Sequence, residues 1–144
     1  MVRACLAVLA ASLSLTAFAT ADPAREAARD RGGSVLVRAL EIAALEASRT
    51  PKRVEGDCLS ACTLYLGLST ACFDRDAVLG FHGPRAPWGA LTPGQFEAAS
   101  AVMARFYPPR VARWFMDEAR FSRALIRVPA AELIDRGEAR ACAE

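Results

Sequence analysis

The chain contains a single lysine, Lys52, and a single histidine, His82. Chemistry that needs a lysine, such as a serine–lysine catalytic pair, is therefore excluded everywhere except at Lys52. Any histidine acting as a general base has to be His82, whose ordinary pKa of ~6.5 would let it accept a proton near neutral pH. The search for reactive groups is thereby reduced to a few positions.

The chain also lacks a large excess of one charge, since 18 Lys and Arg residues stand against 16 Asp and Glu residues. Its arginines are scattered among acidic residues and form no basic stripe with aromatic residues. Nucleic-acid-binding surfaces usually carry such a stripe. We therefore expect no nucleic-acid partner. Repeats and low-complexity linkers are absent from the sequence as well, so no multi-domain array is indicated.

No apolar run reaches the ~20 residues that a membrane-spanning helix needs. The N-terminal run, Ala4–Phe18, follows one cation at Arg3 and is followed by small residues up to Ala21. This is the three-part layout of a secretory signal peptide. We predict a signal peptide at residues 1–21, with an uncleaved anchor as the alternative, and no membrane span after cleavage. The mature chain, 22–144, is long enough for one domain, located in the periplasm or secreted.

Four cysteines remain after processing, namely Cys58, Cys62, Cys72 and Cys142. An even number in an oxidising compartment favours two disulfides, and three connectivities are open. We favour Cys62–Cys72 and Cys58–Cys142. A zinc site is the alternative, because Cys58 and Cys62 have a ligand-like spacing, but export and the lack of a nearby histidine or second close cysteine pair disfavour it. We expect no metal.

An amphipathic helix is predicted from Ser34 to Ala47, after the turn Gly32-Gly33. Its apolar stripe comprises Leu36, Ala39, Leu40, Ala43 and Ala47, and its polar face comprises Ser34, Arg38 and Glu41. Ser34 is a suitable N-cap. The diglycine is either a plain turn or a means of presenting backbone N–H groups to an anion.

A second helix is predicted to begin at Ser60. A strand-like run, Arg53–Glu55, reaches Gly56; a turn of small residues follows, and the apolar run through Leu68 has helical length. The start of a helix supplies free N–H groups and a positive dipole end, which support an oxyanion or a nucleophile. The simpler alternative is that the serine is only an N-cap.

His82 ends an apolar segment, Ala77–Phe81, that is predicted to be a buried strand. A helix followed by this returning strand could bring the imidazole to the hydroxyl of Ser60. The alternative is a turn or core histidine beside Gly83 and Pro84.

The order of these motifs resembles that of Clp-type serine peptidases of the ClpP/crotonase superfamily. A Gly-Gly turn before a helix, then Gly56 four residues before Ser60, then a strand ending in His82 and Pro84, follow the family's sequence of elements. A weaker similarity at Pro129–Gly137 resembles the family's closing helix. The resemblance implies an α/β fold with a single ClpP/crotonase-like domain.

By the same resemblance, Ser60 is the nucleophile and His82 is the base that takes its proton. The N–H groups of Gly33 and Ala61 form the oxyanion hole. Attack on a peptide or other acyl substrate would give an acyl-serine that water releases. No nucleotide, metal or redox cofactor is implied, and self-association remains open because larger family members form rings.

Three departures from the family are visible. The stretch where its orienting acid is expected, Phe121–Ala124, has no carboxylate, so Asp117 is the nearest candidate, with Glu118 and Asp135 behind it. Residues 22–31 are too hydrophilic for the buried strand that precedes the family's diglycine, so the domain is expected to be truncated there.

The final departure from the family concerns the last third of the chain, which is expected to be helical. One helix is predicted from Thr92 to about Phe106 and another from Pro109. The stripes expected to face the core or a sister subunit are Phe96, Ala99, Val102, Met103 and Phe106, then Val111, Trp114, Phe115 and Ala119. Trp88, in the preceding loop, is assigned to core or interface.

Two functions follow from the whole sequence: a serine hydrolase, or a non-catalytic envelope protein that keeps the fold and binds a peptide or partner.

Overall fold

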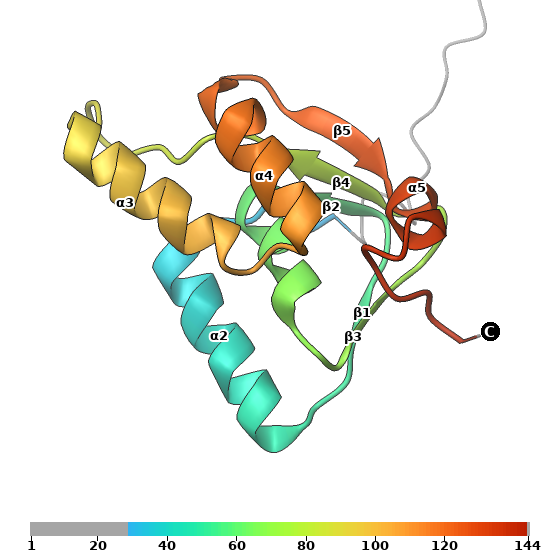
Figure 1. The fold of residues 1–144 in the computed structure, drawn as a ribbon. Helices are drawn as coiled ribbons and strands as arrows, with labels where there is room; N and C mark the ends of the chain where they lie inside the picture. Colours follow the sequence, from blue (N-terminus) through green and yellow to red (C-terminus); the bar gives the residue numbers. More distant parts are fainter. Residues whose placement is uncertain (1–28, 144) are drawn as a thin grey trace, which may run out of the picture.

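The structure, a computed structural model, describes residues 29–143 and combines helices with small β-sheets (Figure 1). The mixed α/β class predicted from the sequence is confirmed. The predicted signal peptide, residues 1–21, lies outside the described residues. Within the described part of the chain, no helix is long and apolar enough to cross a membrane.

The main sheet has three strands in the order β2–β4–β5. Strand β2 (Asp57–Leu59) runs parallel to β4 (Val78–Phe81), and β5 (Ile126–Pro129) runs antiparallel to β4. The register pairs Leu59 with Gly80. Because β2 and β4 are parallel, their carboxyl ends lie at the same edge of the sheet.

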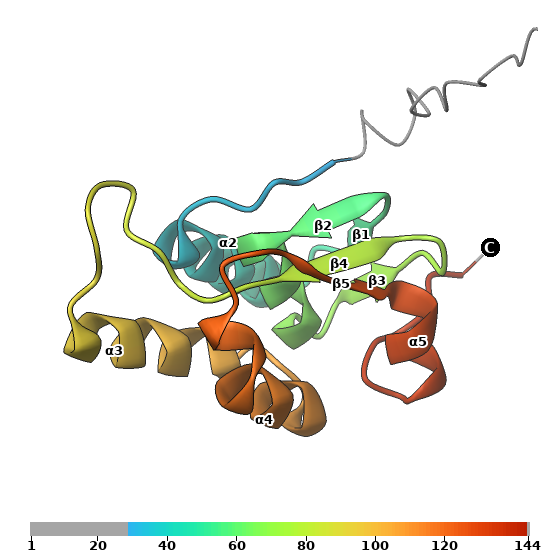
Figure 2. The same cartoon turned by 90° about the horizontal axis from the view of Figure 1, so that it is seen from above.

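A second, two-stranded parallel sheet is formed by β1 (Lys52–Val54) and β3 (Ala71–Phe73). The helices are α2 (Val35–Ser48), α3 (Pro93–Ala104), α4 (Pro109–Asp117) and α5 (Ala130–Asp135), with two 3₁₀ helices, η1 (Ser60–Gly67) and η2 (Ala119–Phe121). Figure 2 shows α3, α4 and α5 on the same side of the main sheet.

The core is centred on η1 and β4. Residues Ala61 to Tyr65 of η1 are buried, and Leu79 and Phe81 of β4 are at most 1% exposed. Phe81 packs edge-on against Tyr107, with ring centroids 5.6 Å apart. Since residues 61–65 of η1 are buried in the core, the first residue of this helix, Ser60, has a fixed position.

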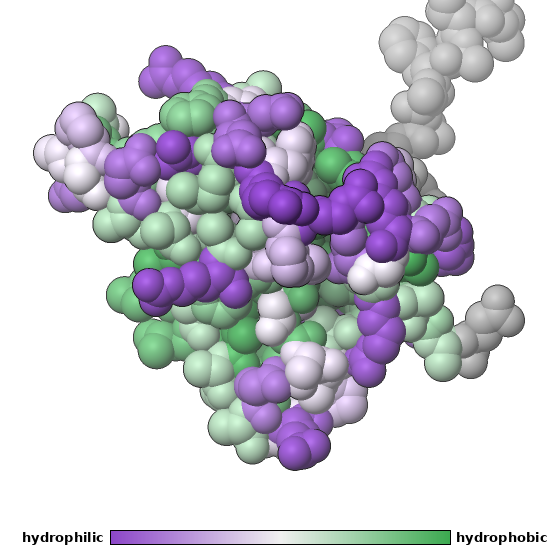
Figure 3. All heavy atoms as spheres, in the orientation of Figure 1, coloured by the Kyte–Doolittle hydropathy of each residue, from purple (hydrophilic) through white to green (hydrophobic). Residues whose placement is uncertain are grey.

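Helix α2 and its cap are confirmed: the Ser34 hydroxyl accepts a hydrogen bond from Val37 N–H at 3.4 Å. The predicted apolar stripe is wrong, because Leu36 and Leu40 are 69% and 65% exposed while Arg38 and Ile42 are buried. Arg38 is buried because its guanidinium finds acidic partners inside the fold. Figure 3 shows apolar side chains on the surface over the region of α2.

The two predicted C-terminal helices are confirmed. Helix α3 begins with a capping box in which Thr92 and Gln95 bond each other's backbone, and α4 begins at Pro109. This part of the chain is not wholly helical, however, because β5 follows η2 and completes the main sheet. Trp88 is 90% exposed, so its assignment to the core was wrong, and its place in an interface stays a prediction.

All four cysteines of the described chain form disulfides, but the favoured pairing is wrong. The bridges are Cys58–Cys62 and Cys72–Cys142. The first bridge joins β2 to the first turn of η1. The second forms because the C-terminal segment lies beside β3, where Cys142 N–H donates to the Phe73 carbonyl at 3.1 Å. Two disulfides are compatible with a periplasmic or extracellular location.

Candidate functional site

Ser60 stands at the junction of β2 and η1 with a left-handed backbone, φ +56°. Within residues 29–143, Arg49 is the other non-glycine residue with positive φ. Such a conformation costs a serine roughly 1–2 kcal/mol and persists only where the surrounding structure imposes it. The strained turn therefore marks Ser60 as a position that the fold holds in place at the edge where β2 ends.

The diglycine turn packs directly on this junction. A Cβ added to Gly32 would lie 2.6 Å from Ala61 N and 2.8 Å from Ser60 Cβ. Gly32 also has φ +87°, which favours glycine. Two segments far apart in the sequence thus meet backbone to backbone, and only glycine at position 32 permits that approach.

The segment before the diglycine pairs with β2. Asp30 N–H donates to the Asp57 carbonyl and Leu59 N–H donates to the Asp30 carbonyl, both at 2.8 Å. This pairing is an isolated bridge and not a strand, so it does not contradict the expectation that the segment is no long buried strand. Strand pairing needs only backbone groups, so a polar residue such as Asp30 can take part at a sheet edge.

Buried Arg38 fixes the diglycine turn. Its Nη2 atom lies 2.8 Å from an Asp30 carboxylate oxygen, while the other Asp30 oxygen accepts from Gly32 N–H at 2.8 Å. Arg38 also donates to the Tyr65 hydroxyl in η1, and Tyr65 donates to Glu41. Burial, and then the hydrogen bond to Glu41, raises the pKa of Tyr65 to about 12. This network ties α2, η1 and the turn together.

Sequence reasoning missed this network because Arg38 was assigned to the solvent face of the helix. The available signal was Asp30, since an aspartate two residues before a glycine often bonds that residue's N–H in a turn. With Gly32 N–H satisfied by Asp30, Gly33 N–H donates no hydrogen bond within the described residues. Ala61 lies in the first turn of η1, where N–H groups lack partners inside the helix.

His82 follows β4 and lies at the same sheet edge as Ser60, which follows β2. Its Nδ1 atom is 2.6 Å from the Gly83 carbonyl oxygen. Because a carbonyl only accepts, Nδ1 carries the proton and Nε2 is left free to accept one. Burial, and then the nearby positive charge of Arg85, lowers the pKa of His82 below its ordinary value, whereas the Gly83 hydrogen bond raises it.

Ser60 and His82 follow two strands that pair with each other, but their side chains form no hydrogen bond. Within residues 29–143, no hydrogen bond links Ser60 Oγ to the His82 ring. Catalytic hydrogen bonds are often long in unliganded enzymes and shorten in the substrate complex. The structure thus places Ser60, the diglycine and His82 at one edge of the main sheet, but the Ser60 hydroxyl and the His82 ring are not hydrogen-bonded.

The stretch expected to carry the orienting acid does lie beside the histidine. Gly83 N–H donates to the Ser122 carbonyl at 3.2 Å, and a Cβ on Gly83 would be 1.7 Å from the Arg120 carbonyl oxygen. Ser122 directs its hydroxyl to the Ala124 carbonyl instead of the histidine. This close packing explains why glycine follows His82.

None of the three candidate acids forms a hydrogen bond or ion pair with His82 within the described chain. Asp117 and Glu118 are exposed at the end of α4. Asp135 pairs with Arg75 at 2.7 Å on the surface. The group that orients the ring is the Gly83 carbonyl, so the described site is a serine and a histidine with no carboxylate.

A cavity of about 640 Å³ lies between the loop that begins at Gly83 and η2, and Gly83, Arg120 and Phe121 are among its lining residues. Neither Ser60 nor His82 lines it, so it reaches the candidate site only through Gly83, the residue after the histidine. Across residues 29–143, no group of three or more His, Cys, Asp or Glu side chains is arranged to hold a metal ion.

Comparisons with protein-family models, with curated proteins and with solved structures gave no significant match to this chain.

Proposed function

We propose that this chain is an exported serine hydrolase that acts on a peptide or other acyl substrate. The observation that carries the proposal is the packing of Gly32 on the Ser60–Ala61 peptide, with Ser60 held in a left-handed turn. A relationship to the ClpP/crotonase superfamily is part of the proposal. It is supported by the parallel pairing of β2 and β4, which end next to Ser60 and His82 respectively.

In the proposed reaction, Ser60 Oγ attacks the substrate carbonyl and His82 Nε2 takes the hydroxyl proton. The N–H groups of Gly33 and Ala61 donate to the oxyanion, and one such donor typically contributes about 3 kcal/mol to lowering the barrier. The proton then passes to the leaving group, and water attacks the acyl-serine with His82 again as base. The cavity beside Gly83 is where the substrate would extend.

The Gly83 carbonyl takes over one task of the missing acid, because it fixes the ring tautomer with Nε2 free. It does not supply the negative charge that stabilises a protonated ring. Loss of the acid in other triads lowers turnover by about 10⁴. A slow enzyme is therefore expected, and acyl-enzyme formation is easier to detect than turnover.

Labelling with a fluorophosphonate probe tests the proposal. The native protein is expected to form one covalent adduct, measured by mass spectrometry and located at Ser60, because the probe needs an activated hydroxyl. Ser60→Ala is expected to lose the adduct, whereas the control Ser48→Ala, at an exposed serine in α2, keeps it. Folded native protein that forms no adduct would contradict the hydrolase.

That negative result would favour the second candidate, a non-catalytic envelope protein that binds a peptide or partner. Two observations support this candidate: Ser60 and His82 share no hydrogen bond, and no carboxylate of the described chain is hydrogen-bonded or ion-paired to His82. A binding protein would keep the cavity beside Gly83 without needing a reactive hydroxyl.

The rate of labelling is expected to rise with pH and to level off by neutral pH. Its midpoint should lie below the ordinary histidine pKa of about 6.5, because burial disfavours the charged ring and only the neutral ring can accept the proton. A pH series of adduct formation measures this midpoint. His82→Gln, the control, should label far more slowly and show no such step; a native midpoint at or above 6.5 would contradict the assignment.

The lowered pKa of His82 also makes the free energy of unfolding depend on pH, so that it decreases as the pH falls. Because the folded-state pKa of His82 is lower than the unfolded one, the unfolded chain binds the extra proton first as the pH falls. The stabilisation that neutral His82 provides is therefore fully present above the pKa that His82 has in the unfolded chain. It is lost as the pH falls from that value through the lower pKa of His82 in the folded protein.

A further inference from the structure

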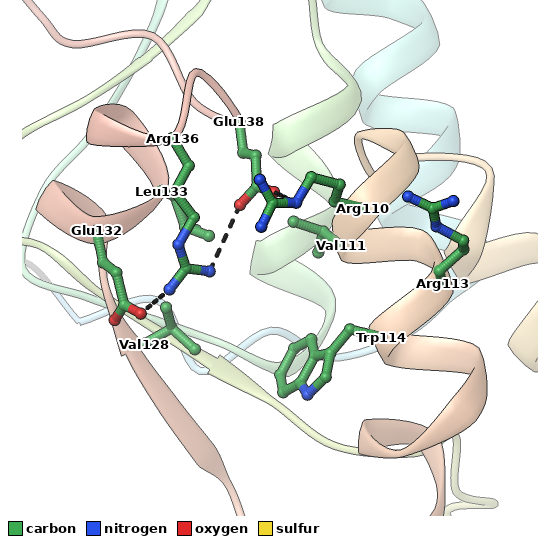
Figure 4. A pocket seen from close by; sticks show the side chains of 9 residues that line it. All are labelled: Arg110, Val111, Arg113, Trp114, Val128, Glu132, Leu133, Arg136 and Glu138. Atoms are coloured by element: carbon green, nitrogen blue, oxygen red, sulfur yellow. Dashed lines mark ion pairs between the residues drawn. The ribbon is translucent and has the colours of Figure 1, made fainter.

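A second cavity, of about 440 Å³, lies between α4 and the β5–α5 segment (Figure 4). Its apolar wall is made by Val111 and Trp114 of α4, Val128 of β5 and Leu133 of α5. A volume of this size suits a small organic ligand. The lining includes neither Ser60 nor His82 and shares no residue with the cavity beside Gly83, so the cavity is separate from the site proposed above.

A buried carboxylate lies in this lining. Glu138 is 8% exposed, and its Oε1 atom is 3.3 Å from Arg110 Nε. Its other oxygen, Oε2, is 3.8 Å from Arg136 Nη1 and accepts no hydrogen bond within the described residues. Figure 4 shows the carboxyl group directed between the two arginines. A buried oxygen without a hydrogen bond is unfavourable, and a ligand N–H would satisfy it.

The cavity also has one uncompensated positive charge. Of its three arginines, Arg136 pairs with both Glu132 and Glu138, and Arg110 pairs with Glu138. Arg113 makes no ion pair or hydrogen bond within residues 29–143, yet it lines the cavity one residue from Trp114. Figure 4 shows its guanidinium directed away from Trp114, but the side chain is exposed and free to turn toward the apolar wall. A planar guanidinium is suited to binding a carboxylate. Hydrophilic side chains gather on the surface between α4 and α5 in Figure 3.

We propose that this cavity binds an apolar carboxylic acid with an adjacent N–H group, the chemistry of the C-terminal residue of a peptide. The ligand carboxylate pairs with Arg113 and its N–H donates to Glu138 Oε2. Its apolar side chain packs on Trp114 and Leu133. The N–H reaches Oε2 after a shift of Arg110, whose side chain is 67% exposed and has room to move.

The test is a fluorescence titration of a Trp88→Phe protein, in which Trp114 is the remaining tryptophan. N-acetyl-leucine is expected to give a saturable change. Arg113→Gln should weaken its binding by at least about tenfold, the effect of losing one charge-assisted hydrogen bond. Arg105→Gln, which removes the same charge at an exposed position outside the cavity, should bind as the parent does.

Two further ligands test the parts of the proposal. N-acetyl-leucinamide, which lacks the carboxylate, and 4-methylpentanoate, which lacks the N–H, are both expected to bind more weakly than N-acetyl-leucine. A tetrapeptide ending in leucine that competes would extend the site to peptide C-termini, and its failure would restrict the site to free N-acyl amino acids.

The proposal is overturned if N-acetyl-leucine gives no saturable change at millimolar concentration, or if its amide binds equally well. It is overturned also if both arginine variants lose the same affinity. Ser60→Ala is expected to bind as the parent does, so the result does not depend on the hydrolase.

Discussion

Replacing Gly32 by alanine is expected to abolish labelling of Ser60 and to lower the free energy of unfolding by roughly 2–4 kcal/mol. The added Cβ would lie 2.5 Å from the Leu59 carbonyl oxygen and 2.6 Å from Ala61 N. These are backbone atoms of β2 and η1, which cannot move aside as a flexible side chain can. The diglycine turn would have to retreat, and it would carry Gly33 N–H away from Ser60.

The matched control is Gly89→Ala. Gly89 also has positive φ, +71°, but a Cβ there would meet no atom within 4 Å. This variant therefore carries only the conformational strain, about 1 kcal/mol, and is the control for stability. Urea unfolding measures the stability difference even if the parent protein does not label. A Gly32→Ala protein that is as stable as Gly89→Ala would contradict the packing argument.

Local signals in the sequence were sufficient to predict α2, α3 and α4. Ser34 and the Thr92–Gln95 pair are caps, and Pro109 suits the first turn of a helix, so each start depends on residues close in sequence. Strand β4 was predicted for the same reason, since its apolar run is short and bounded by turn residues.

Features that depend on distant partners could not be predicted. Strands β2 and β5 are only 3 and 4 residues long and are stabilised by pairing with β4, which no local pattern encodes. The burial of Arg38 depends on Asp30 and Tyr65, which lie on other segments. The approach of the His82 ring to the Ser60 hydroxyl, expected from motif order, stays a prediction; the structure shows that the strands before the two residues are paired and parallel.

The disulfide pairing failed for a related reason. Cys58 and Cys62 approach because the chain turns sharply at Ser60, whose left-handed backbone the sequence does not reveal. Cys142 reaches Cys72 because the C-terminal segment returns to β3, where Ala141 forms a bridge with Phe73. Both approaches are consequences of the tertiary fold and not of cysteine spacing.

Removing the Cys72–Cys142 bridge, by replacing both residues with alanine, is expected to lower the free energy of unfolding by about 4 kcal/mol. The bridge joins residues 70 positions apart, so in the unfolded chain it closes a large loop and removes much conformational entropy. It also holds the C-terminal segment beside β3. The midpoint of urea unfolding under non-reducing conditions measures the loss, which is a large share of the stability of so small a domain.

Removing the Cys58–Cys62 bridge is the matched comparison, because both cysteines are buried but stand only 4 positions apart. The loop-entropy argument assigns this bridge about 2 kcal/mol. Its main effect should be local: it encloses Ser60, so its loss is expected to relax the left-handed turn and to slow labelling more than removal of Cys72–Cys142 does. If the short bridge proved the larger contributor to global stability, loop closure would not be the source of the stabilisation, and packing around the buried sulfurs would be.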